Sequence, residues 1–226
     1  METGANNVFG NRTLNEIQAW NLEPGQYFKR AANSDIQPFE IIDRQEYIIF
    51  TNAFDTFKQL HPDLQNYLQA NSSKLKARAA YKRGNCQWWQ YTWPLNWSWY
   101  GAKRILSPYL AKSNRFALDE KVEFLSLTDT TVIFDSGQQE DLYYILALLN
   151  TDLLTNRYKS IGKLKGSGVY EYFWNNVSKM PIKRIDFSNT KQVSLHNQIV
   201  NLSKQLVNLL KRKTMTPLEI QKREAA

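Results

Sequence analysis

The sequence predicts a mixed α+β fold, in which a meander of strands packs with helices and a long helix follows at the C-terminus. Three observations predict it. Short β-branched and aromatic segments alternate with turn residues over residues 103–134. Apolar residues recur at helical spacing over residues 62–79 and 142–158. A row of apolar residues that starts at Leu195 has spacings of 4, 3, 4 and 3.

The N-terminal part predicts short extended segments. Residues 3–7 are polar and turn-forming, so a loop is expected there, with a short strand at Val8 and Phe9. Residues 47–51 are β-branched and aromatic and predict a strand, and residues 36–42 predict a weaker one before it.

A helix is predicted to start at His61-Pro62-Asp63, because proline suits the first helical position and an early acid favours the helix dipole. Its buried side is expected to hold Leu64, Tyr67, Leu68, Leu75 and Ala79. Lys74, Arg78 and Lys82 are spaced i, i+4 and i+8 on a neighbouring ridge, which could follow a DNA backbone.

The second half predicts strands at residues 103–109, 115–118, 122–127 and 131–134, joined as a meander. Ser136 with Gln139 resembles a capping box, and an apolar helix is expected after it to about Tyr158. A flexible basic loop is expected over residues 159–170.

The last long helix carries a heptad-like seam of Leu195, Ile199, Leu202, Leu206 and Leu209. Such a seam is typical either of a helix that packs on its own domain or of a contact with another protein, and both interpretations stay open. We expect one domain over residues 1–187 and a helical extension over residues 188–226.

The charge distribution indicates a polyanionic partner. The chain has a net charge of +8, a pI near 9.4, and no apolar run long enough to span a membrane. Ten cations face one anion over residues 58–115, a local +9, and seven face one over residues 157–184, a local +6. Everything outside these zones is therefore net −7, which favours one cationic surface, a saddle for a double helix.

Tryptophans crowd the first basic zone, at positions 88, 89, 93, 97 and 99. Flat aromatic rings between cations either pack a scaffold or stack on bases, and we expect most of these rings in packing and one or two at a ligand. Cys86 is the one cysteine, which excludes an internal disulfide and fits a reducing cytoplasm.

Enzymatic and metal sites find little support. Cys86, His61 and His196 are too far apart in sequence for a zinc site, and neither histidine has the setting of a catalytic base, so both are expected at the surface or as helix caps. Gly166-Ser167-Gly168 lacks the third glycine of a dinucleotide loop, and a loop that reaches DNA phosphates is favoured instead.

A metal-dependent nuclease is a weaker alternative. Pro62-Asp63 and Asp119-Glu120-Lys121 match a loose pattern of acidic metal ligands followed by a lysine. However, a helix start explains Asp63, and a turn between strands explains Asp119 and Glu120.

The order and spacing of several short motifs resemble a known family, the TaqI-like C-terminal specificity domain. The motifs are Thr3-Gly4 through Phe9, Pro62 to Leu68 with Leu75 and Arg78, Trp88-Trp89, Lys103-Arg104-Ile105 through Pro108, Phe116-Ala117-Leu118-Asp119, Leu148-Leu149-Asn150-Thr151, Gly168-Val169-Tyr170-Glu171 and Met180-Pro181-Ile182. Arg104 departs from the family pattern, where a lysine is expected.

The resemblance implies a target recognition domain, which follows the catalytic domain in many adenine-specific DNA methyltransferases of restriction-modification and phage-defence systems. No two prolines are adjacent, so an Asn-Pro-Pro-Tyr type loop is absent from this chain. Neither a catalytic residue nor a cofactor or metal site is therefore expected here, and the methyl-transfer machinery, with its S-adenosylmethionine, is expected in an upstream domain.

The resemblance and the basic zones together predict double-stranded DNA as the partner of a cytoplasmic protein. The expected phosphate contacts are Arg78, Lys82, Arg83, Lys103, Arg104, Lys112, Lys163 and Lys165. Loops over residues 85–101 and 163–170 are the candidates for reading bases. An alternative is the recognition half of a multi-subunit restriction specificity protein, whose helical seam docks modification subunits.

Overall fold

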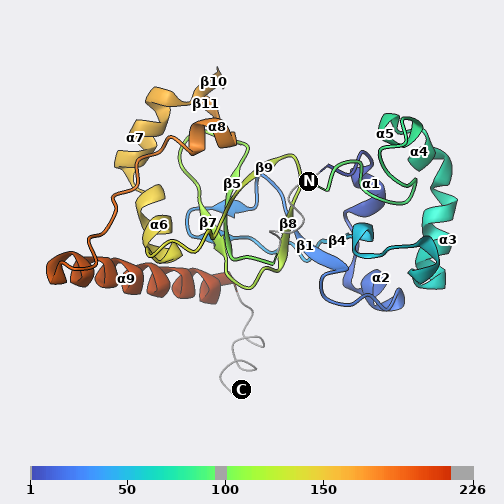
Figure 1. The fold of residues 1–226 in the computed structure, drawn as a ribbon, viewed down its shortest axis with the longest axis horizontal. Helices are drawn as coiled ribbons and strands as arrows, with labels where there is room; N and C mark the ends of the chain where they lie inside the picture. The colour runs from blue at the N-terminus through green and yellow to red at the C-terminus, as the bar shows by residue number, and fades with distance from the viewer. Residues whose placement is uncertain (1, 95–100, 215–226) are drawn as a thin grey trace, which may run out of the picture.

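The computed structural model describes residues 2–94 and 101–214 and has an α+β fold of two lobes (Figure 1). The predicted fold class is confirmed, as is the long C-terminal helix, α9 (Thr190–Thr214). None of the described helices is both long and apolar enough to cross a membrane.

The N-terminal lobe combines short helices with small sheets. Its elements are α1 (Asn6–Phe9), α2 (Leu14–Ala19), β1 (Tyr27–Ala31), β4 (Tyr47–Ile49), η1 (Thr51–Ala53), η2 (Phe57–Gln59), α3 (Pro62–Ala70), α4 (Ser72–Lys76) and α5 (Ala79–Lys82). The short hairpin of β2 (Ile36–Gln37) and β3 (Glu40–Ile41) also comes from this part of the sequence but contacts strands of the C-terminal lobe. A buried apolar cluster from α1, β4, α3 and the tryptophan segment, here residues 88–99, fills the N-terminal lobe. Within it, the ring of Tyr91 makes edge contacts with Phe9 and with Phe50.

The C-terminal lobe is built around strand β5 (Arg104–Pro108). It also contains β6 (Leu110–Ala111), β7 (Ala117–Asp119), β8 (Phe124–Ser126), β9 (Thr130–Phe134), α6 (Leu142–Leu149), α7 (Asp152–Ile161), β10 (Lys163–Gly166), β11 (Val169–Glu171) and α8 (Trp174–Val177). β5 lies between β7 and β9, antiparallel to both, and α6 covers this sheet.

Strand β8 connects the two lobes. It pairs in parallel with β1, with Lys29 opposite Phe124 and Ala31 opposite Ser126, so it belongs to the sheet β4-β1-β8. The predicted meander is therefore wrong at this strand, although all four predicted strands exist. Local sequence pattern reports strand content, whereas the partner of a strand is set by tertiary packing.

Several predicted helices are broken or displaced. The helix predicted from Pro62 starts there, with His61 as its N-cap, but Asn71 and Arg78 divide it into α3, α4 and α5. The predicted apolar helix is also two helices, because Thr151 caps the N-terminus of α7 through the amide of Leu154. Asp141, not Ser136, caps α6.

Two further differences concern short segments. The strand expected at Val8 and Phe9 is helix α1. Helix α2 and strand β1 lie in segments for which the sequence predicted no element. The loop expected over residues 159–170 is instead the end of α7 followed by the hairpin of β10 and β11.

Helix α9 packs on α6 along one edge of the C-terminal lobe (Figure 1). Its buried row is His196, Val200, Ser203 and Val207, and the valines belong to the same apolar cluster as α6. The row predicted as its seam faces solvent, since Leu195, Leu202 and Leu209 are each more than half exposed. The helix thus packs on its own domain through a different row from the one the heptad spacing indicated.

Candidate nucleic-acid interface

The hairpin of β10 and β11, residues 163–171, projects from the C-terminal lobe and is here called the basic hairpin. All four residues of β10 are exposed, and Lys163 and Lys165 alternate with Leu164. Gly166, Ser167 and Gly168 have positive φ angles of 112°, 51° and 72°, a conformation that glycine adopts without strain. The glycines therefore support a tight turn at its tip, and a dinucleotide loop is not needed to explain them.

Glu171 holds both lysines of the basic hairpin. Its carboxylate lies 3.2 Å from the Nζ of Lys165 and 3.9 Å from the Nζ of Lys163, and it accepts a hydrogen bond from the Tyr109 hydroxyl. The bond from Tyr109 and the neighbouring Lys165 hold the pKa of Glu171 below its usual range. The lysines thus lie on one face of the hairpin, and their charge is partly balanced from within.

Lys112 extends the same basic surface. It follows β6, whose Ala111 pairs with Tyr170 of β11, so Lys112 lies toward the tip of the hairpin. Lys112 is exposed. The small sheet β10-β11-β6 therefore brings together Lys112, Lys163 and Lys165, three of the cations predicted to contact phosphate.

Buried aromatic residues anchor this sheet. The Tyr158 hydroxyl donates to the carbonyl of Glu171 at 2.6 Å, and the Tyr158 ring stacks on Tyr172 with 4.1 Å between centroids. Tyr172 in turn donates to Asn114, whose amide donates to the carbonyl of Leu149 at the end of α6. Burial raises the pKa of Tyr158 to about 12, so this hydroxyl stays protonated and keeps donating at neutral pH.

Lys82 and Arg83 lie in the other lobe, at the C-terminus of α5, and both are exposed. In Figure 1, α5 and the basic hairpin both lie along the upper edge of the view, on separate lobes, and α9 lies along the lower edge. That their lysines and arginine form one saddle for a duplex remains a prediction.

Arg78 was predicted to contact phosphate, but its side chain is buried inside the N-terminal lobe. Its side chain donates to four backbone carbonyls, those of Thr3, Leu75, Trp88 and Gln90, at 2.6–2.8 Å. Because it lies in extended backbone between α4 and α5, it also interrupts the expected ridge of Lys74 and Lys82. Arg78 ties the N-terminal segment to the tryptophan segment.

Arg104 is the second predicted phosphate contact that the structure places in the interior. Its side chain is fully buried in β5 and binds Asp119 of β7 with its Nε at 3.1 Å and its terminal nitrogen at 3.0 Å. Burial raises the pKa of Asp119, an effect that Arg104 and the amides of Glu123 and Phe124 oppose. Both charges serve the interior of the lobe, so a phosphate contact by Arg104 would require the core to open.

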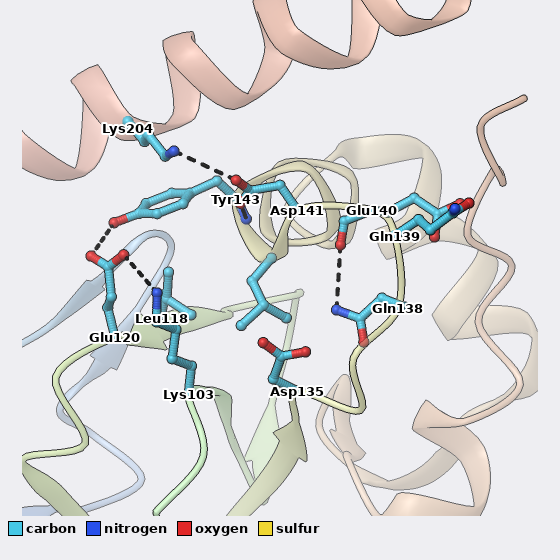
Figure 2. A pocket seen from close by; sticks show the side chains of 11 residues that line it. Lys103, Leu118, Glu120, Asp135, Gln138, Gln139, Glu140, Asp141, Tyr143 and Lys204 are labelled. Atoms are coloured by element: carbon cyan, nitrogen blue, oxygen red, sulfur yellow. Dashed lines mark hydrogen bonds and ion pairs between the residues drawn. The ribbon is translucent and has the colours of Figure 1, made fainter. Parts of the chain in front are cut away.

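Lys103 lies at the far end of β5 from Lys112, in an acid-rich hollow beside α9 (Figure 2). Its Nζ is 3.5 Å from Glu120, which also accepts a hydrogen bond from Tyr143 at 2.8 Å. The cavity, of about 290 Å³, is further lined by Asp135, Glu140 and Asp141. Because these carboxylates would repel a phosphate, the structure also disfavours Lys103 as a phosphate contact.

The two histidines lie on separate lobes of the structure, and so do the two acidic motifs of the nuclease pattern. His61 caps α3, one of the two positions expected. His196, for which a surface or capping position was also expected, is buried and accepts a hydrogen bond from the amide of Asp141. Asp63 lies on α3 of one lobe and Asp119 on β7 of the other (Figure 1). Across residues 2–94 and 101–214, no three His, Cys, Asp or Glu side chains are grouped as a metal site would require.

The tryptophan segment is only partly described. Trp89 is buried and Trp88 is half-buried, both against Phe57, whereas Trp93 is 54% exposed. Trp97 and Trp99, and with them most of the second half of the expected base-reading loop, lie outside the described residues. The described part agrees with the expectation that most of these rings pack.

Sequence reasoning missed two sets of residues at the basic hairpin. Tyr109 and Glu171 were not recognised as partners of its lysines, because Tyr109 lies between β5 and β6, Glu171 lies on β11, and the two are 62 residues apart. Phe173 and Trp174 were overlooked as well, although they are 43% and 65% exposed. The consecutive aromatic residues directly after a basic segment were the signal that could have identified them.

The fold and the site define a mixed α+β module with an exposed basic hairpin. The family model of the TaqI-like C-terminal specificity domain matches residues 32–182, more than half of the chain. The chain therefore belongs to the TaqI-like C-terminal specificity domain family, which confirms the resemblance seen in the sequence.

A solved structure shares this fold. The Type IIL restriction-modification enzyme MmeI, solved in complex with DNA, superposes with a TM-score of 0.64 at 10% sequence identity. The similarity covers 92% of this chain and 27% of the MmeI chain, so this chain spans about a quarter of that enzyme's length. A comparison with curated proteins found no match.

Proposed function

We propose that this chain is the sequence-specific DNA target recognition domain of an adenine-specific DNA methyltransferase in a restriction-modification or phage-defence system. The observation that carries the proposal is the match of the specificity-domain family over residues 32–182. The exposed basic hairpin supports it, because lysines on a projecting element can displace counterions from a duplex. The fold similarity to MmeI, a restriction-modification enzyme solved with DNA, is a second support.

In this proposal, recognition and chemistry are divided between domains of a cytoplasmic protein. Lys82, Arg83, Lys112, Lys163 and Lys165 contact phosphates and set the position of the duplex, whereas side chains of residues 85–101 and 163–170 read bases. Methyl transfer from S-adenosylmethionine takes place on an upstream catalytic domain. The recognition domain holds the duplex while the target adenine leaves the stack and enters the catalytic pocket.

The direct test is selection of duplexes from a random library by the chain itself, followed by a binding titration on the enriched sequence. The proposal predicts enrichment of one short sequence, bound at least on the order of a thousandfold more tightly than random duplex. Binding without any enrichment would contradict sequence recognition. An enriched sequence made of G·C pairs alone would contradict the adenine-specific parent.

The exposed leucines of α9 favour a second arrangement, the recognition half of a multi-subunit restriction specificity protein. Leu195, Leu202, Leu206 and Leu209 lie on one face of α9 and remain uncovered when the helix packs on α6. In this arrangement, a separate modification subunit docks on that face. Sedimentation of the chain with the modification subunit of its own system tests this arrangement. Only this arrangement predicts a complex that the double variant Leu202→Gln with Leu209→Gln abolishes.

A further inference from the structure

Two consecutive aromatic side chains project from the C-terminal lobe directly after the basic hairpin. Phe173 is the N-cap residue of α8 and is 43% exposed, and Trp174 is the first residue of that helix and is 65% exposed. We call this pair the aromatic step. Leaving two large adjacent rings in water forfeits the apolar burial that most such side chains gain on folding, so a partner that covers them is favoured.

The backbone fixes the direction of the aromatic step. Tyr172, the residue before it, is fully buried, stacks on Tyr158 and donates a hydrogen bond to Asn114. The hydroxyl of Thr131 donates to the carbonyl of Tyr172, which ties the same segment to β9. Because Tyr172 points inward and is anchored on two sides, the backbone that follows it is fixed at the surface, where Phe173 and Trp174 remain exposed.

The aromatic step is connected to the lysines of the basic hairpin. The Phe173 ring meets Tyr109 edge-on, with 6.3 Å between centroids, and lies 6.0 Å from the Trp174 ring. Tyr109 in turn donates to Glu171, which binds Lys163 and Lys165. One continuous surface therefore carries two cations at one side and two exposed rings at the other.

The ring of Trp174 also borders an apolar cavity of about 360 Å³. Its other walls come from Val132 and Ile133 of β9, Ile145 and Leu149 of α6, and Met180. The ring therefore has a mostly apolar wall on one side and is exposed to solvent on the other.

We propose that the aromatic step packs against the sugars and base edges of duplex DNA whose phosphates the basic hairpin binds. This inference rests on the proposed function and adds an uncharged contact to it. Charge complementarity favours DNA as the partner. The lysines match the phosphates, and the exposed rings next to them match the sugars and base edges of the same duplex. An apolar protein partner would cover the rings but would not engage the two adjacent lysines, whose charge Glu171 balances only in part.

The test compares the salt dependence of duplex binding by Trp174→Ala, Trp174→Phe and the pair Lys163→Ala with Lys165→Ala. Trp174→Ala is expected to weaken binding on the order of tenfold at every salt concentration, and Trp174→Phe much less. Its plot of log affinity against log salt should stay parallel to that of the wild type, because no counterion is released at the ring. The lysine pair should instead flatten the slope.

Leu153→Ala is the matched control, since Leu153 is 77% exposed on α7, outside the basic hairpin and the aromatic step. It should leave binding unchanged. Equal binding by Trp174→Ala and the wild type would overturn the inference while the lysine pair still weakens binding. If neither weakens binding, the DNA interface of the proposed function is itself wrong.

A fluorescence measurement covers the case in which Trp174→Ala does not fold. Addition of duplex should quench the emission of the wild type more than that of Trp174→Phe, because a ring in contact with bases loses emission. Identical quenching in the two proteins would overturn the inference.

Discussion

Arg104 shows how the role of a single cation depends on its surroundings. It lies in the basic zone of the sequence, but its side chain is completely buried against Asp119. Removing one partner of a buried ion pair leaves the other charge without compensation, which is the costly case. Arg104 is thus a structural residue, and its neighbour in sequence, Lys103, is the one that reaches solvent.

Arg104→Met is therefore expected to lower the free energy of unfolding by about 3–5 kcal/mol. Adding Asp119→Asn should recover part of that loss, because the uncharged amide no longer needs a counter-charge and its single oxygen can still accept from one of the two backbone amides that Asp119 binds. Urea unfolding of the single and double variants measures the difference. A single variant as stable as the wild type would show that the pair does not stabilise the fold.

Glu171 limits the charge that the basic hairpin can offer to DNA. Glu171→Gln keeps a hydrogen-bond acceptor for Tyr109 but removes the negative charge beside Lys163 and Lys165. Binding to random duplex should become tighter, and the salt slope should steepen by up to about one unit. Glu123→Gln removes the same charge beside Lys29, away from the hairpin, and should change binding less. An equal effect of both variants would contradict a specific role of Glu171.

Glu140 makes stability depend on pH. Burial acts to raise its pKa, but hydrogen bonds from Arg184 and from the amide of Ile185 outweigh that effect, so the pKa lies below its usual 4.5. A carboxyl whose pKa is lower in the folded state stabilises above its unfolded pKa and loses that effect as pH falls through its folded pKa. The Tm difference between the wild type and Glu140→Gln should be constant above about pH 5 and shrink below it. A constant difference down to pH 3 would contradict this assignment.

At the level of elements, α9 has two apolar rows that make different contributions. Val200 and Val207 pack on α6, whereas Leu202 and Leu209 face solvent. Val207→Ala should cost about 2 kcal/mol of unfolding free energy through the lost methyl groups and the cavity. Leu202→Ala should change it by less than about 0.5 kcal/mol. Urea unfolding of both variants measures this, and a larger loss for Leu202→Ala would show that the leucine row is the packed one.

The elements also show how far the sequence predicts this fold. Strands such as β4 and β9 and the start of α3 were predictable, because β-branched runs and a proline at the first helical position are local signals. The heptad spacing predicted α9, but the row that packs on its own domain is a different one, and contact of the leucine row with another protein remains a prediction. Periodicity reports that apolar residues share a face, while the core residues of α9 include His196 and Ser203, which no apolar pattern marks.

The sequence predicted that the candidate site would consist of lysines and arginines, but it did not show which of these residues share one surface. Lys112, Lys163 and Lys165 form one surface because β6 and β10 flank β11. The pairing of β6 with β11 joins residues some 60 positions apart, which no local pattern contains. Arg78 and Arg104 were indistinguishable from surface cations in the sequence. Their roles follow from the carbonyls and the carboxylate that surround them in the fold.

For the whole molecule, the expectation was a single cationic side formed by residues widely separated in sequence. Five of the eight predicted contacts, Lys82, Arg83, Lys112, Lys163 and Lys165, are exposed, and α5 and the basic hairpin lie along the upper edge of Figure 1. The other three stabilise the interior or lie in the acidic hollow at α9. The proposed saddle is therefore left with fewer cations than the sequence indicated, most of them on or beside the basic hairpin.

The most direct test of this account is the salt dependence of duplex binding by Lys112→Ala, Lys163→Ala and Lys165→Ala combined, beside Lys103→Ala. Each lost phosphate contact should reduce the slope of log affinity against log salt by about 0.9, so the triple variant should lose up to about 2.7. Lys103→Ala should keep the slope of the wild type. A triple variant with the wild-type slope, or an equal loss from Lys103→Ala, would contradict the assignment of the DNA interface to the basic hairpin.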